Sequence, residues 1–108
     1  MISPERIQQM AHEKRRIKKV NEILDLLQEE CGEVIQMVSK ARRFGLDEKR
    51  EDLVQEIGDI SLLIELLHAY ELFTHAELNQ AKLNKATKLV KWSSIYDEGI
   101  QWRLMNTK

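Results

Sequence analysis

Two stretches decide the fold: residues 23–34, ILDLLQEECGEV, and residues 53–67, LVQEIGDISLLIELL. In both stretches leucine and isoleucine recur at steps of three and four residues, the spacing that places side chains on one face of an α-helix. The 108-residue chain contains one proline and four glycines, and so few helix breakers favour long helices. The pattern predicts an all-α protein built as a helical bundle.

Capping residues and a glycine predict where the first helical region begins and ends. Ser3–Pro4 is typical of a helix start, and Gly45 is typical of the left-handed residue that follows a helix. Between them an apolar stripe runs at helical spacing, with a polar gap at Lys14, through Ile7, Met10, Ile17, Leu24, Cys31 and Val38. The stripe fits either one helix to about Arg43 or two helices broken near Asn21, and we favour two.

The rest of the chain carries signals for two more helices. A second long helix is predicted from about Glu48 to Leu72. The segment Thr74–Glu77 has the pattern of a capping box and opens a third helix, which ends at about Trp92 because two serines follow. The tail to Lys108 is short and ambiguous. We treat residues 1–108 as a single domain.

Composition excludes several classes of function. The net charge is −1, so no strong positive field attracts a nucleic acid polymer or an anionic membrane. No apolar run approaches membrane-spanning length, and the N-terminus has no leader pattern. The single cysteine, Cys31, cannot form an internal disulfide, which suits a reducing compartment. We therefore expect a complete cytoplasmic protein.

The most informative feature is a set of acidic side chains on faces that are otherwise apolar. Glu30 and Glu33 are three residues apart, and Glu56 and Asp59 repeat this spacing on the next long helix. A carboxylate on a partly buried face loses hydration at a considerable cost in free energy. Neither face offers an arginine or lysine within one turn, so a divalent cation is the simplest compensation, and Mg²⁺ prefers oxygen ligands that it shares with phosphate. The alternative is a solvated seam between loosely packed helices.

The same residues resemble the signature of a known family. Glu29–Val34 and, after a variable gap, Glu56–Ile60 resemble the Glu-x-x-Glu and Glu-x-x-Asp motifs of the MazG-like all-α nucleotide pyrophosphohydrolases. The matching region, about residues 23–67, covers close to half of the chain. Gly32 and Gly58 occupy the same relative place in the two motifs, and a glycine inside a helix suggests close backbone packing or approach of a ligand.

The resemblance implies hydrolysis of a nucleoside triphosphate, (d)NTP, to the monophosphate and pyrophosphate, with Mg²⁺ as cofactor and Mn²⁺ as a substitute. It also implies a MazG-like bundle whose four-helix core is completed by oligomerisation, as a homodimer or homotetramer. By motif position, Glu30, Glu33, Glu56 and Asp59 are the metal ligands. Glu29 matches an acid often found before the first motif, so Glu29 and Glu30 are the catalytic candidates, and which carboxylate activates water stays open.

Basic and amide residues that follow the second acidic motif contact phosphates in similar proteins. By position and chemistry, Lys82, Asn84 and Lys85 are therefore the predicted substrate-binding residues. Lysines at this spacing also occur on solvated helix faces, which is the alternative interpretation.

The sequence also contains a cysteine and three aromatic residues with no motif of their own, and it allows one other function. Cys31 lies on the apolar stripe and is predicted to be a core thiol. Trp92, Tyr96 and Trp102 either stack on a nucleobase or belong to a core or subunit interface. The competing function is a non-catalytic helical interaction module whose stripe from Ile7 to Val38 is buried against a partner.

Overall fold

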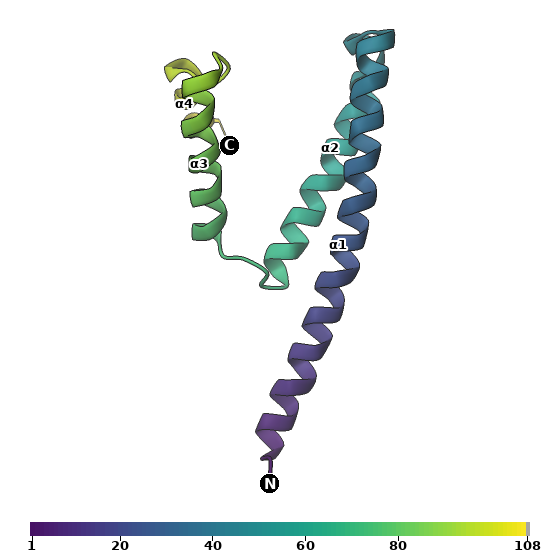
Figure 1. Ribbon diagram of the computed structural model, residues 1–108, viewed down its shortest axis with the longest axis vertical. Helices are drawn as coiled ribbons and strands as arrows, with labels where there is room; N and C mark the ends of the chain where they lie inside the picture. Colours follow the sequence, from purple (N-terminus) through teal and green to yellow (C-terminus); the bar gives the residue numbers. More distant parts are fainter. Residues whose placement is uncertain (108) are drawn as a thin grey trace. The chain divides into compact units, whose positions relative to one another are not determined.

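The computed structural model describes residues 1–107, and these residues form four helices and no strand (Figure 1). In chain order the helices are α1 (Pro4–Phe44), α2 (Leu46–Ala69), α3 (His75–Trp92) and α4 (Glu98–Asn106). The predicted all-α class is confirmed. Within the described range, no helix combines the length and apolar composition that crossing a bilayer requires.

The chain divides into two compact units. The first, Met1–Leu72, contains α1 and α2, and the second begins at Phe73 and contains α3 and α4. Each unit is described by itself. The prediction that residues 1–108 act as one domain stays a prediction.

α1 is one continuous helix of 41 residues, so the predicted break near Asn21 is wrong. Asparagine weakens a helix by only about 0.7 kcal/mol relative to alanine, and the Asn21 side chain is exposed. Its neighbours Val20 and Ile23 are buried, and packing of this kind outweighs a small difference in propensity. The helix starts as predicted, because the Ser3 hydroxyl accepts a hydrogen bond from the Arg6 amide at 3.1 Å.

A single glycine joins α1 to α2. Gly45 has a positive φ of 107°, a backbone conformation that a residue with a Cβ rarely adopts. Its amide donates to the Ala41 carbonyl at 2.9 Å and so ends α1. Because α2 begins at the next residue, Leu46, the chain folds back on itself, and α1 and α2 form an antiparallel hairpin (Figure 1).

The two helices of the hairpin pack along one contact line on each helix. The buried residues of this line are Val20, Ile23 and Ala41 on α1, and Leu63 and Leu67 on α2. Half-buried residues at steps of three and four continue the line, as in coiled-coil pairs, namely Leu27, Val34 and Met37 on α1 and Leu53 and Ile60 on α2. The interface is thin, since no side chain among the described residues is less than 2% exposed.

The apolar stripe predicted on α1 is not the buried face. Its members from Ile7 to Val38 are exposed, including Ile17 at 47% and Leu24 at 39%. α1 carries two apolar lines displaced by one residue, which is about 100° around the helix. Contact with α2 buries the line of Val20 and Ile23, and periodicity within α1 does not distinguish the two.

Arg16 marks the place where the hairpin ends. Its guanidinium donates to the carbonyl oxygens of Tyr70 at 3.0 Å and Glu71 at 3.4 Å, and it forms an ion pair with Glu13 at 2.6 Å. Tyr70 and Glu71 directly follow α2, so Arg16 joins α1 to the chain segment at which α2 has ended. The residues of α1 that precede Arg16 continue past the end of α2 (Figure 1).

The second unit opens with the predicted capping box. The Thr74 hydroxyl accepts from the Glu77 amide at 3.1 Å, and the Glu77 carboxylate accepts from the Thr74 amide at 2.9 Å. The predicted end of α3 at Trp92 is also confirmed. The Asp97 carboxylate then accepts from the Ile100 amide at 2.9 Å, so the ambiguous tail contains a capped fourth helix.

Candidate metal centre

Three carboxylates from α1 and α2 come together in the hairpin. One oxygen atom from each of Glu30, Glu56 and Asp59 lies within 4.8 Å of the other two, and all three residues are half-buried. Glu30 and Glu56 occupy positions of the contact lines whose other members are apolar. The antiparallel hairpin therefore gathers acids that are about 26 residues apart in the sequence.

The hydrogen bonding of the Glu56 carboxylate tests whether these three residues fit a bound cation. Its Oε2 atom is buried and has no hydrogen-bond partner among the described residues. Burying a carboxylate oxygen without a donor is unfavourable because its hydration is not replaced. Divalent cations that prefer oxygen ligands replace that hydration. The donor set of Glu30, Glu56 and Asp59 therefore fits such a cation.

The pKa of Glu30 reflects the acidic surroundings of its side chain. The pKa of Glu30 is raised above its ordinary value, first because the protonated Glu30 carboxyl group can donate a hydrogen bond to Glu56, whereas the ionised form cannot. Partial burial raises this pKa further, and so do the negative charges of Asp59, Glu56 and Glu33. A bound divalent cation would reverse this effect by favouring the ionised form.

Gln55 orients Asp59 and was not found from the sequence. Its side-chain amide donates to the Asp59 Oδ1 atom at 2.9 Å. The four-residue spacing of an amide and a carboxylate on one helix is the signal that could have found it. Gln55 thus holds one of the three acids in place.

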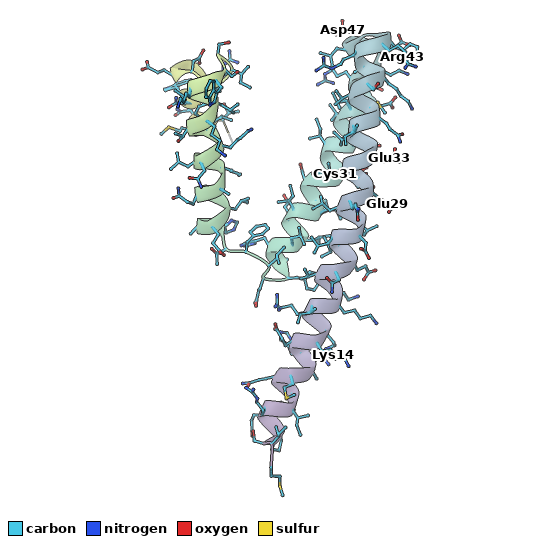
Figure 2. All side chains as sticks on the ribbon, in the orientation of Figure 1. Lys14, Glu29, Cys31, Glu33, Arg43 and Asp47 are labelled. Carbon is cyan, nitrogen blue, oxygen red and sulfur yellow. The ribbon has the colours of Figure 1, made fainter. Side chains whose placement is uncertain are left out.

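Glu33 and Glu29 are both exposed on α1 (Figure 2). Glu33 does not belong to the group of three oxygens, although its charge contributes to the raised pKa of Glu30. Glu33 follows Glu30 by three residues, so the two side chains share one face of α1. The roles of Glu33 as a ligand and of Glu29 in activating water stay predictions.

Comparison with known protein families assigns the chain to a family independently of the geometry of the acids. A family profile described as "MazG nucleotide pyrophosphohydrolase domain" matches residues 18–90, which is more than half of the chain. The chain belongs to the MazG family. The matched range includes both acidic motifs and most of α3, so the resemblance inferred from Glu29–Val34 and Glu56–Ile60 is confirmed. Neither the curated proteins nor the solved structures yielded a match.

The MazG match also covers the predicted substrate-binding residues, which lie on α3 in the second unit. Lys82, Asn84 and Lys85 are all exposed, and the Asn84 side-chain oxygen accepts from Gln80 at 3.0 Å, which leaves the Asn84 amide group to donate. Lys82 also lines an open depression of about 590 Å³ with Tyr96 and four other residues of this unit. The phosphate-binding role of the three residues stays a prediction.

The prediction that Cys31 is a core thiol is wrong, and one of the two explanations offered for Gly32 and Gly58 is excluded. Cys31 is exposed on α1 and is not a core thiol (Figure 2), because the contact line passes through Glu30 instead. Leaving aside the chain neighbours and the nearby backbone of the same helix, a Cβ built on Gly32 or Gly58 would meet no described atom within 4 Å. Close packing within the chain therefore does not explain either glycine of these MazG motifs.

Proposed function

We propose that this MazG-family chain is a Mg²⁺-dependent nucleoside triphosphate pyrophosphohydrolase that converts (d)NTP to (d)NMP and pyrophosphate. The observation that carries the proposal is the convergence of Glu30, Glu56 and Asp59, with a buried and unpartnered oxygen on Glu56. Membership of a family of nucleotide pyrophosphohydrolases supports the same reaction class.

Glu30, Glu56 and Asp59 would hold the metal, with Glu33 joining them after rotation of its side chain. When bound, Mg²⁺ would neutralise phosphate charge and lower the pKa of a coordinated water. In the reaction, water attacks the α-phosphorus, the bond from this phosphorus to the bridging oxygen breaks, and pyrophosphate leaves. Glu30 or Glu29 accepts the proton of the attacking water.

The remaining residue roles concern the substrate. Lys82 and Lys85 would bind phosphate oxygens by charge, and the free amide group of Asn84 would donate a hydrogen bond. Mn²⁺ would replace Mg²⁺, since both prefer oxygen ligands. We also keep the homodimer or homotetramer and the cytoplasmic location as proposals.

The decisive experiment measures pyrophosphate release from a panel of ribo- and deoxyribonucleoside triphosphates with Mg²⁺. We expect wild-type protein to release pyrophosphate from at least one of them, and Glu56→Gln and Asp59→Asn to lose at least a hundredfold in kcat/KM. Glu65→Gln is the matched control, because Glu65 is an exposed glutamate of α2 outside the cluster. Its rate should equal that of wild type.

Two results would reject the proposal. One is equal pyrophosphate release by wild type, Glu56→Gln and Asp59→Asn, which would place the active site elsewhere. The other is a wild-type protein that is folded and binds Mg²⁺ but releases no pyrophosphate from any triphosphate, which would favour the non-catalytic interaction module.

A further inference from the structure

A depression at the open end of the α1–α2 hairpin is lined mainly by basic side chains. We call it the basic pocket. It has a volume of about 340 Å³, and its residues are His12, Arg15, Arg16 and Lys19 on α1, and Ala69, Tyr70 and Glu71 at the end of α2. All seven belong to the first unit, so the pocket lies within one compact body. It shares no residue with the candidate metal centre.

The net charge of −1 conceals an uneven distribution of charge along the chain. Residues 1–22 contain six lysines and arginines but three glutamates, whereas residues 23–108 contain eleven basic and fifteen acidic residues. The N-terminal part of α1 is therefore basic, although the chain as a whole is not. A local excess of positive charge attracts ligands of negative charge, and the basic pocket lies within it.

The helical spacing of α1 turns three of the basic side chains toward one side. His12, Arg15 and Lys19 follow one another at steps of three and four residues, so they are neighbours on the helix surface, and all three are exposed. Arg15 has no hydrogen bond or ion pair with another described residue. Lys19 has only a contact of 4.0 Å with the exposed Glu22, which contributes little in water. These charges are therefore available to a ligand.

Arg16 builds the pocket and does not supply a free charge to it. Its guanidinium forms an ion pair with Glu13 and donates to the carbonyl oxygens of Tyr70 at 3.0 Å and Glu71 at 3.4 Å. Its side chain is only 22% exposed. Arg16 thus fixes the end of α2 against α1 and leaves the other basic side chains to face the opening.

The end of α2 does not need those other basic side chains either. Glu71 has a positive φ of 63°, which is uncommon for a residue with a Cβ. Its amide donates to the His68 carbonyl at 2.9 Å, and the Leu72 amide donates to the Leu67 carbonyl at 3.0 Å. This is the bonding pattern that satisfies the last carbonyls of a helix. Capping of α2 therefore does not explain the remaining positive charge of the pocket.

We propose that the basic pocket binds a nucleoside monophosphate. Arginine and lysine are the usual partners of phosphate oxygens, and here Arg15 and Lys19 would hold the phosphate group with His12. The half-buried Tyr70 offers an aromatic wall for the nucleobase. The Glu71 carboxylate accepts hydrogen bonds from sugar hydroxyls or base amino groups, and its negative charge disfavours a second phosphate group. The volume is within the range of small-molecule sites.

The pocket is separate from the candidate metal centre. Lys19 and Glu30 are eleven residues apart on the continuous helix α1, which is about 16 Å along its axis. One phosphate group cannot contact both places. The inference therefore stands or falls separately from the proposed hydrolase activity, and binding is measured in EDTA, without any divalent cation.

The first test titrates AMP into the protein by calorimetry in EDTA. We expect wild type to bind with a Kd below about 1 mM and Arg15→Gln/Lys19→Gln to bind at least about tenfold more weakly. The matched control is Lys14→Gln/Lys18→Gln, which removes the same charge from exposed positions of α1 outside the pocket; its Kd should stay within about twofold of wild type. Wild type without AMP binding, or equal affinities of the two double variants, would overturn the proposal.

The second test separates the nucleoside from the phosphate. Inorganic phosphate and AMP are titrated into wild type and Tyr70→Leu, whose backbone carbonyl remains for Arg16. We expect wild type to bind AMP at least about tenfold more tightly than phosphate, and Tyr70→Leu to lose most of this preference while its affinity for phosphate is unchanged. Equal affinities of wild type for AMP and phosphate, or an unchanged preference in Tyr70→Leu, would refute the nucleoside assignment.

Discussion

Replacing Glu56 by glutamine tests the electrostatic argument directly. In the metal-free protein, the Glu56 and Asp59 carboxylates have oxygens within 4.8 Å of each other. Two like charges at this distance repel by about 1 kcal/mol in bulk water and by about 3.5 kcal/mol at an effective dielectric constant of about 20. Both residues are half-buried, so we expect a value between these limits.

The neutral amide removes this repulsion while keeping the size of the side chain. The free energy of unfolding of metal-free Glu56→Gln should therefore exceed that of wild type by about 1–3 kcal/mol. The glutamine amide also supplies a donor to the neighbouring carboxylates, which acts in the same direction. A chain of this size should show the change as a rise of several degrees in melting temperature.

Addition of Mg²⁺ should reverse the order of stability. A ligand that binds only the folded state adds about 2.7 kcal/mol when its concentration is about a hundred times its Kd. Wild type has all three clustered acids and should gain this stabilisation, whereas Glu56→Gln lacks one carboxylate oxygen and its negative charge and should gain little. If Glu56→Gln is the more stable protein without metal and wild type is the more stable protein with Mg²⁺, the three acids form a metal centre. Acids that only repel one another would not show this reversal.

The assay is urea denaturation followed by circular dichroism, with EDTA or with excess Mg²⁺, at equal protein concentration. Glu65→Gln makes the same chemical change at an exposed position of α2 and should differ from wild type by less than about 0.5 kcal/mol in both conditions. If Glu56→Gln is the less stable protein without metal, or if Mg²⁺ stabilises it as much as wild type, the reasoning fails.

Three further predictions concern titration, packing and capping. Because the pKa of Glu30 is raised in the folded protein, the metal-free protein should gain stability as the pH falls from that raised pKa to the ordinary glutamate value. Glu30→Gln should abolish this gain and Glu22→Gln should preserve it; unfolding curves across that pH range that coincide for all three proteins would contradict this. Leu63→Ala should cost about 2–3 kcal/mol in urea unfolding, since Leu63 is buried at 7% exposure between α1 and α2, and a loss below about 1 kcal/mol would show that the hairpin interface is wrong. Thr74→Ala should cost about 1 kcal/mol because it removes the capping box of α3, whereas Thr87→Ala inside the same helix should be close to neutral; equal effects in thermal unfolding would exclude a special role for the cap.

Local features of the sequence predicted some helix boundaries correctly, whereas the second helix was expected from about Glu48 to Leu72 and extends from Leu46 to Ala69. Gly45 as the end of α1 and the capping box at Thr74 depend only on neighbouring residues, and both are confirmed. The break near Asn21 was wrong because propensity differs little between residues and packing along α2 outweighs it. The fourth helix was missed because its cap, Asp97, precedes a short segment without clear periodicity.

For the candidate site too, the sequence predicted the local spacing of the acids, and tertiary packing decided which of them meet. The spacing within each motif placed Glu30 with Glu33 and Glu56 with Asp59, since three residues make nearly one helical turn. Only the pairing of α1 with α2 selects Glu30, Glu56 and Asp59 as the group that meets, and leaves Glu33 exposed beside it. A distance across two helices depends on their register, which no motif within one helix contains.

The sequence by itself determined that this chain is helical, where α1 starts and ends, where α3 starts and ends, and which acidic motif it carries, because each of these properties arises from interactions over four or five residues. The tertiary structure decided which of two apolar lines on α1 is buried, and therefore which carboxylates face one another and that Cys31 is exposed. The two lines are chemically alike, and only the direction from which α2 approaches distinguishes them. That direction follows from the turn at Gly45 and from packing along the whole hairpin.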